Sequence, residues 1–233
     1  MEQAVRKIAL LGMGTVGGGV YEIIERQKEE MPFKIGAALE VVKVLVRNKA
    51  KYADRIPAEK LTDVWEDVIG DDSIDIVVEV MGGIEPARTY IKAALEKGKH
   101  VVTANKDLMA MHGHELLELA GEHHCDLLFE AAVAGGIPII RPLKQCLAGN
   151  NITEIMGIIN GTTNFILTKM THEGMEFDEA LALATELGYA EADPTADIEG
   201  HDACRKIAIL TSLVCGQQVD FQDIHTEGIT KIT

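Results

Sequence analysis

The chain has 233 residues, enough for one large or two small domains with buried cores. Its formal net charge of −15 excludes nucleic acid and anionic membrane surfaces as expected partners, because both would repel it. Hydrophobic residues make up 47% of the chain and aromatic residues only 4%, a composition that suits an α/β protein.

The four cysteines are widely spaced and form no Cys-x-x-Cys pair. This spacing favours free thiols in a reducing compartment. The apolar run after the basic N-terminal residues is soon interrupted by glycines, unlike the core of a signal peptide. No apolar stretch is long enough to span a bilayer. We therefore expect a cytoplasmic protein.

A Gly-x-Gly-x-x-Gly turn joins a short apolar strand at Ile8–Leu11 to an amphipathic segment. The turn consists of Gly12, Met13, Gly14, Thr15, Val16 and Gly17. The first glycine permits a tight turn, the second lets the backbone approach a pyrophosphate, and the third allows close helix–strand packing. The helix start then offers unpaired N–H groups to phosphates. Such turns also arise for steric reasons alone, but the flanking strand and helix favour a dinucleotide site.

Strands and helices alternate through the first half of the chain. We predict strands over Leu39–Val46, Ile74–Val80, His100–Thr103 and Leu127–Glu130, and helices over Pro86–Lys97 and Asp107–Glu122. This alternation predicts a Rossmann-type, doubly wound parallel sheet. Ligands bind such sheets at the carboxyl ends of the strands. Besides the glycine turn, the residues expected there are Arg47, Met81, Gly82, Gly83, Thr103, Asn105 and Lys106.

The second strand ends at Arg47-Asn48-Lys49, and no acidic residue follows before Asp54. An acidic residue at this point usually binds the ribose 2′-hydroxyl of NAD, whereas a basic residue suits the 2′-phosphate of NADP. Ordinary surface charge after a strand is the alternative interpretation. The position at the end of the strand favours a cofactor role, so we expect NADP in preference to NAD.

The pattern changes beyond about Val133. A glycine-rich loop precedes a helical stretch to about Leu147, a predicted strand over Ile152–Ile159, and helices over Thr162–Thr171, Phe177–Leu187 and Ile198–Cys215. An acidic loop over residues 189–197 separates the last two helices. We expect residues 1–133 to form the nucleotide-binding domain and residues 134–233 to form an α+β catalytic and dimerisation region.

The last predicted helix carries Asp202 and Lys206 on one face, since they lie four residues apart. The helix is otherwise apolar nearly all round, which is typical of a buried helix. Buried charges are costly unless they are paired or functional. A salt bridge at a helix start is the alternative, but the dinucleotide turn elsewhere in the chain favours a catalytic pair.

Six blocks of the chain closely resemble homoserine dehydrogenase, and they occur in the same order. The blocks are Leu11–Gly17, Thr103–Lys106, Glu130–Pro138, Asn160–Leu167, Gly188–Pro194 and Asp197–Lys206. The resemblance implies an NAD(P)-dependent reduction of L-aspartate 4-semialdehyde to L-homoserine, a reversible step of threonine and methionine biosynthesis.

The same resemblance implies roles for individual residues. Lys206 would donate the proton to the aldehyde oxygen, Asp202 would assist it, and Lys106 would lie near the nicotinamide and the substrate. The substrate pocket implied by the match consists of Glu191, which would bind the amino group, and of Asn160, Gly161, Thr162, Thr163 and Asp197. A monovalent cation, Na⁺ or K⁺, would be bound chiefly through backbone carbonyls by Glu130, Val133, Gly135 and Ile137.

The resemblance also implies a homodimer built from the second half of the chain. The family pattern runs on beyond Thr233, so we expect this chain to be a C-terminally truncated form. A dinucleotide-binding module without catalysis, such as a redox-responsive binding protein, is the alternative to an enzyme. Such a module would not need Glu191, Asp202 and Lys206 in one constellation.

Overall fold

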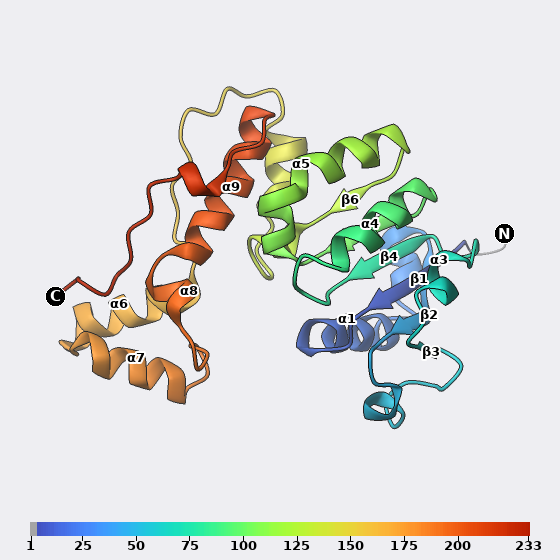
Figure 1. The fold of residues 1–233 in the computed structure, drawn as a ribbon, viewed down its shortest axis with the longest axis horizontal. Coiled ribbons are helices and arrows are strands. Elements are labelled where there is room, and N and C mark those ends of the chain that lie inside the picture. The colour runs from blue at the N-terminus through green and yellow to red at the C-terminus, as the bar shows by residue number, and fades with distance from the viewer. Residues whose placement is uncertain (1–3) are drawn as a thin grey trace. The chain divides into compact units, whose positions relative to one another are not determined.

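A computed structural model describes residues 4–233 of the chain. The chain divides into two compact units, Met1–Ala132 and Val133–Thr233, which run from blue to green and from yellow to red in Figure 1. Each unit has a hydrophobic core of its own. No helix among the described residues is both long enough and apolar enough to cross a membrane.

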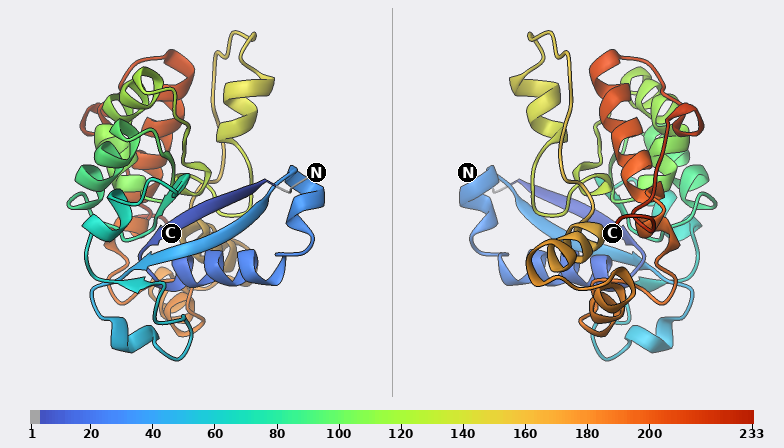
Figure 2. Two further views of the ribbon diagram at one scale, coloured as in Figure 1. Left: turned by 90° about the vertical axis from the view of Figure 1, so that its right-hand side faces the viewer. Right: turned by 90° about the vertical axis from the view of Figure 1, so that its left-hand side faces the viewer.

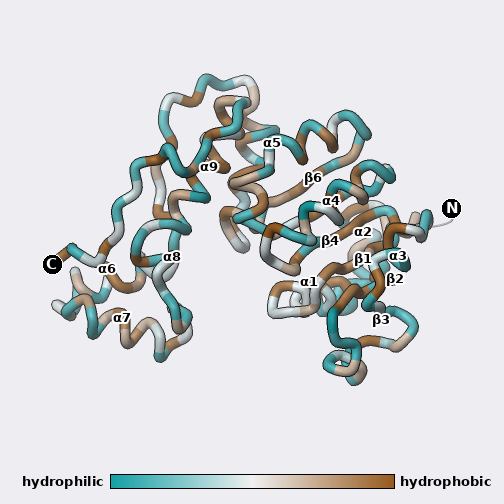
Figure 3. The backbone as a smooth tube through the Cα atoms, in the orientation of Figure 1, coloured by the Kyte–Doolittle hydropathy of each residue, from teal (hydrophilic) through white to brown (hydrophobic). Residues whose placement is uncertain are grey.

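The first unit is a six-stranded sheet with the strand order β3-β2-β1-β4-β5-β6, in which all neighbouring strands are parallel. The strands are β1 (Val5–Leu11), β2 (Ala38–Leu45), β3 (Leu61–Thr62), β4 (Ile76–Glu79), β5 (His100–Thr103) and β6 (Leu127–Leu128). The apolar segments of the central strands are brown in Figure 3, as expected for a sheet covered on both faces. The predicted Rossmann-type fold is confirmed.

Helices α1 (Thr15–Arg26), α4 (Ala87–Glu96) and α5 (Lys106–Glu122) follow β1, β4 and β5. The short helices α2 (Met31–Ile35) and α3 (Glu66–Ile69) complete the unit. The chain moves outward from β1 in one direction and from β4 in the other. Right-handed crossovers therefore place α1 on one face of the sheet and α4 and α5 on the other (Figures 1 and 2). The strand order reverses between β1 and β4, which is where such sheets bind ligands.

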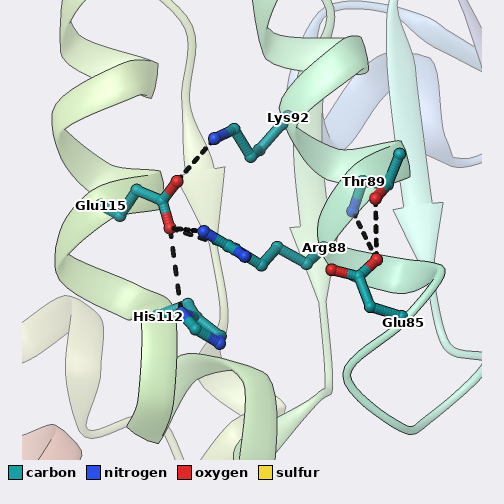
Figure 4. A network of polar contacts seen from close by, with 6 residues as sticks. All are labelled: Glu85, Arg88, Thr89, Lys92, His112 and Glu115. Atoms are coloured by element: carbon teal, nitrogen blue, oxygen red, sulfur yellow. Dashed lines mark hydrogen bonds and ion pairs between the residues drawn. The ribbon is translucent and has the colours of Figure 1, made fainter.

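Helices α4 and α5 are joined by ion pairs on Glu115 (Figure 4). Its carboxylate accepts hydrogen bonds from Lys92 Nζ at 2.6 Å and from Arg88 Nη2 at 2.7 Å. The hydrogen bond from Lys92, followed by that from Arg88, lowers the pKa of the Glu115 carboxyl. These side chains are about one-third exposed, so water screens the attraction and the pairs add little stability. They connect α4 and α5 at the surface of the first unit.

Regular structure in the described part of the second unit is helical. Its helices are α6 (Gly161–Glu173), α7 (Phe177–Glu186), α8 (Thr195–Ile198) and α9 (His201–Cys215). Helices α6 and α7 pack together through Ile166, Ala180 and Ala184, which are fully buried. The small alanine side chains let the two helices approach closely.

The strand predicted over Ile152–Ile159 is wrong. Residues 151–160 form no regular secondary structure, and Met156 and Ile158 are 85% and 80% exposed. A strand needs a neighbour whose N–H and C=O groups pair with its own. The apolar composition predicted a strand, but no strand lies beside this segment within residues 133–233.

Two helical predictions and one loop prediction for the second unit also need correction. The stretch expected to reach Leu147 contains a π-helical turn at Pro142–Cys146. The predicted helix over Ile198–Cys215 is divided, because Gly200 adopts a φ of +80° between α8 and α9. The acidic loop contains the first residues of α8. Thr195 is the first residue of this helix, and its hydroxyl and N–H donate hydrogen bonds to the Asp193 carboxylate. These bonds lower the pKa of Asp193.

Candidate active site

Two glycines of the turn after β1 are required for steric reasons within the fold. Gly12 has a φ of +98°, and a Cβ there would lie 2.9 Å from the carbonyl oxygen of Val80. A Cβ on Gly17 would overlap with the carbonyl oxygen of Gly12. Helix α1 and strands β1 and β4 thus approach as closely as the glycine pattern predicts.

Gly14 differs from these two glycines. It is the N-cap of α1, its φ of −74° suits any residue, and nothing lies within 4 Å of the position of a Cβ. No side chain caps the N-terminus of α1 in the described structure. The turn therefore leaves open space in front of uncapped helix N–H groups, which fits the pyrophosphate of a dinucleotide. Thr15 and Val16 are exposed beside this space, whereas Met13 is buried.

The basic residues after β2 differ in whether they already form an ion pair with the protein. Lys49 Nζ pairs with Asp63 at 2.6 Å, and this hydrogen bond lowers the pKa of Asp63. Arg47 is exposed and forms no ion pair within residues 4–233. Arg47 is therefore the cation at this strand end that can meet a phosphate directly.

The segments after β4 and β5 are connected through Glu79, which sequence reasoning missed. Its carboxylate is fully buried and accepts hydrogen bonds from Met81 N at 2.8 Å and from the Thr103 hydroxyl at 2.6 Å. The available signal was a single acidic residue within the apolar run 76–80. Burial of that residue could not be inferred from the run alone.

Asn105 adds a second connection between these segments. Its side chain caps α5 by accepting a hydrogen bond from Leu108 N at 3.1 Å, and its Nδ2 donates to the Gly83 carbonyl at 2.6 Å. Lys106 is the first residue of α5 and is partly buried. The predicted cofactor residues Met81–Gly83 and Thr103–Lys106 therefore form one connected edge of the sheet.

Lys206 and Asp202 form a buried ion pair on α9. The distance from Lys206 Nζ to Asp202 Oδ2 is 2.8 Å, and the two side chains are 17% and 8% exposed. Lys206 Nζ also donates to the carbonyl oxygen of Ile159 at 2.7 Å. An ammonium has three N–H donors, so one remains beyond the bonds made within residues 4–233.

Asn160 connects this pair to α8. Its Nδ2 donates to Asp202 Oδ2 at 2.9 Å and to Asp197 Oδ1 at 2.7 Å. Its Oδ1 accepts from Thr163 N at 2.8 Å, which caps α6. A flipped amide would place its oxygen against two carboxylates, so only one orientation satisfies every partner. Four predicted site residues, Asn160, Asp197, Asp202 and Lys206, thus form one hydrogen-bonded cluster.

The other predicted substrate residues lie around this cluster or apart from it. The Thr162 hydroxyl donates to the Tyr189 carbonyl at 2.6 Å, which attaches the acidic loop to α6. Gly161 is exposed at the start of α6. Glu191 is exposed, and its side chain forms no hydrogen bond or ion pair with the rest of the described chain.

The four residues expected to bind a monovalent cation lie around the division between the two units. Glu130 begins a 3-10 turn of the first unit, while Val133, Gly135 and Ile137 belong to the second. The carbonyl oxygens of Val133, Gly135 and Ile137 accept no hydrogen bond within residues 4–233. No group of three or more His, Cys, Asp or Glu side chains suited to a metal ion occurs among the described residues.

The doubly wound sheet with its glycine turn at the switch point defines the class: a Rossmann-type dinucleotide-binding protein. Comparison with known families is more specific. Residues 12–130 match the NAD-binding domain of homoserine dehydrogenase, and residues 138–233 match the homoserine dehydrogenase family itself. The chain belongs to the homoserine dehydrogenase family, whose members are oxidoreductases acting on CH–OH groups. The resemblance noted in the sequence is confirmed.

Similar proteins cover nearly the whole chain. A homoserine dehydrogenase of Bacillus subtilis (strain 168) is 50% identical over 228 residues, which are 97% of this chain and 53% of that protein. A crystal structure of the enzyme from Thiobacillus denitrificans has a TM-score of 0.91 and 47% identity, covering 99% of this chain and 54% of that one. The chain therefore spans about half the length of these relatives.

A third relative carries a cofactor. A hyperthermophilic archaeal homoserine dehydrogenase, solved in complex with NADPH, is 32% identical and has a TM-score of 0.85. The match covers 98% of this chain and 75% of the archaeal chain.

Proposed function

We propose that this chain carries the cofactor-binding and catalytic parts of a homoserine dehydrogenase. It would interconvert L-aspartate 4-semialdehyde and L-homoserine with NADP as the preferred cofactor, in the biosynthesis of threonine and methionine. The observation that carries the proposal is the Lys206 ammonium, held between Asp202 and the Ile159 carbonyl with one N–H donor left over by the part of the chain that the structure describes. A non-catalytic binding module would not require this cluster.

Reduction of an aldehyde adds a hydride to carbon and a proton to oxygen. A nicotinamide supplies the hydride when bound, and the residues of this chain orient the carbonyl and supply the proton. Lys206 would donate a hydrogen bond to the aldehyde oxygen, stabilise the negative charge developing there, and then transfer its proton. Asp202 would hold the ammonium in place, and Asn160 would hold Asp202.

The charge around the cluster suits an amino-acid substrate. The hydrogen-bonded cluster contains two carboxylates, those of Asp197 and Asp202, and one ammonium, that of Lys206, and Glu191 adds an exposed carboxylate on the nearby acidic loop. Excess negative charge favours the α-ammonium of the substrate. We propose that Glu191 binds this ammonium, that residues 160–163 line the pocket, and that Lys106 contacts the substrate and the nicotinamide.

The two units would divide these tasks, with residues 1–133 binding the cofactor and residues 134–233 providing the substrate site and the dimer interface. Oxygen ligands suit hard cations, and the carbonyls of Val133, Gly135 and Ile137 accept no hydrogen bond from the described residues, which supports a Na⁺ or K⁺ site together with Glu130. The four unpaired thiols of Cys125, Cys146, Cys204 and Cys215 support a cytoplasmic location.

The direct test is the homoserine-dependent reduction of NADP⁺, followed by the absorbance of NADPH. The assay is run in potassium and in choline salts, with L-serine as a shorter alcohol for comparison. We expect reduction with homoserine, little with serine, and a faster rate in potassium. The absence of any homoserine-dependent reduction would contradict the proposed activity, and equal rates in both salts would contradict the cation site.

Arg47→Ala should weaken NADPH binding much more than NADH binding, because only NADPH carries the 2′-phosphate. A charge-assisted hydrogen bond contributes about 1.5–3 kcal/mol, which corresponds to roughly 10- to 150-fold in Kd. Titration of both reduced cofactors measures the ratio, and Arg26→Ala, at the far end of α1, is the matched control. Equal weakening of the two cofactors would show that Arg47 does not contact that phosphate.

We expect the chain to form a homodimer through its second unit. Met156 and Ile158 are almost fully exposed on the segment 151–160, which has no strand partner in the described structure. Soluble monomers rarely expose a large contiguous apolar surface. Sedimentation at micromolar concentration should give twice the chain mass, and Met156→Glu with Ile158→Glu should shift it toward the monomer. A single-chain mass for the unmodified protein would count against dimerisation.

A further inference from the structure

The first unit contains a buried carboxylate that the mechanism above does not use. We propose that Glu79 is a positioning residue for cofactor binding, which holds the segments after β4 and β5 in one arrangement. This inference rests on the proposed function, because it is there that Met81–Gly83 and Thr103–Lys106 are assigned to the cofactor.

The placement of Glu79 follows from the sheet register. Glu79 is the last residue of β4 and is paired with Thr103, the last residue of β5. Side chains at paired positions of neighbouring strands lie on the same face of a sheet. Glu79 and Thr103 therefore meet at the carboxyl edge, and both are buried.

The two carboxylate oxygens of Glu79 bind different segments. Oε1 accepts hydrogen bonds from Met81 N at 2.8 Å and from Gly82 N at 3.4 Å. These bonds hold a bend in which Gly82 and Gly83 have φ angles of +76° and +75°. Consecutive glycines have much conformational freedom to lose on folding, and the hydrogen bonds to Glu79 favour this one conformation.

The other oxygen connects this bend to the segment after β5. Oε2 accepts from the Thr103 hydroxyl at 2.6 Å, and the Thr103 oxygen accepts in turn from Asn105 N at 3.0 Å. The bond from Asn105 Nδ2 to the Gly83 carbonyl at 2.6 Å closes a ring of hydrogen bonds. One carboxylate thereby holds both segments, the one after β4 and the one after β5, at the edge of the sheet that would contact the nicotinamide half of the cofactor.

A role in packing alone would not require this charge. No lysine, arginine or histidine pairs with Glu79 in the described chain, so N–H and O–H donors alone stabilise the carboxylate. Burial of a charge without an ion-pair partner is unfavourable in free energy. An apolar residue of similar size would give a more stable core. The carboxylate is suited to organising donors because it offers acceptors on both sides.

The test measures the Kd for NADPH, by cofactor fluorescence, alongside the thermal midpoint of each variant. Glu79→Gln keeps the size of the side chain and one acceptor oxygen, but it replaces Oε2 with a donor and so deprives the Thr103 hydroxyl of its acceptor. Thr103→Val removes that hydroxyl and Thr103→Ser retains it. We expect Glu79→Gln and Thr103→Val each to raise the Kd about tenfold, and Thr103→Ser to recover most of the affinity.

The double variant Glu79→Gln with Thr103→Val should bind NADPH no more weakly than either single variant, because both changes break the same bond. A Kd unchanged in Glu79→Gln overturns the inference, as does a lowered thermal midpoint without a change in Kd. If Glu79→Gln does not fold, equal Kd values for Thr103→Ser and Thr103→Val overturn it. Failure of the unmodified chain to bind NADPH instead overturns the proposed function, and this inference with it.

Discussion

Lys206→Ala is expected to lower the rate of homoserine-dependent NADP⁺ reduction by roughly 10²–10⁴-fold, the usual effect of losing a general acid. The Kd for NADPH should stay close to that of the unmodified chain, because the glycine turn and the edge around Glu79 belong to the other unit. Initial rates and fluorescence titration measure these two quantities separately.

A suitable control is Lys169→Ala, which removes a partly buried lysine of α6 that pairs with Glu173. It should leave the rate unchanged.

Removal of one partner of a buried ion pair destabilises a protein by about 3–5 kcal/mol, so the thermal midpoint of each Lys206 variant must be recorded. Lys206→Met combined with Asp202→Asn removes both charges and should restore stability without activity. Near-normal turnover in a folded Lys206 variant would remove this lysine from the mechanism.

Gly14→Val should abolish most cofactor affinity while leaving the protein folded. Apart from its neighbours in the chain, no described residue lies within 4 Å of a Cβ at this position, and its φ of −74° is open to valine. The side chain would therefore fill only the space in front of the α1 N–H groups. Loss of charge-assisted hydrogen bonds to the pyrophosphate costs about 1.5–3 kcal/mol, or roughly 10- to 150-fold in Kd.

Two neighbouring glycines test this explanation. Gly19→Ala lies inside α1, also with nothing within 4 Å, and should bind NADPH normally with stability raised by about 0.5–1 kcal/mol. Gly17→Ala should instead destabilise the protein, because its Cβ would overlap with the Gly12 carbonyl. A Gly14→Val variant that binds NADPH like the unmodified chain would show that the phosphates do not lie at this turn.

Much of the first unit was predictable because its signals are local. The apolar run of β1, the glycine turn and the amphipathic start of α1 are contiguous in the chain, and each step has its own steric or hydrophobic signature. Alternation of strands and helices then favours a parallel sheet with right-handed crossovers. Even here, Glu79 was missed, because burial of one acidic residue depends on what the neighbouring strand places beside it.

The second unit was less predictable because its elements depend on distant partners. Its helices α6 and α7 agree with their periodic patterns, but the apolar segment Ile152–Ile159 is not a strand. A strand exists only where a second segment pairs with it, and composition does not show whether that segment is present. Gly200 was similarly ambiguous, because a glycine can lie inside a helix or, with a positive φ, end one, and the residue type alone does not decide between the two. Here its φ is +80°, and a Cβ would lie 3.0 Å from the carbonyl oxygen of Glu227.

The sequence by itself determined that Asp202 lies beside Lys206, because residues four apart on a helix are neighbours whatever the rest of the chain does. It determined equally that the glycine turn follows a buried strand. Only the tertiary structure decided that Asn160 joins Asp197 to Asp202, since these contacts span 37 and 42 residues and exist only once α6, α8 and α9 have packed. Local spacing is set by backbone geometry, whereas contacts at long range follow from packing of the whole unit.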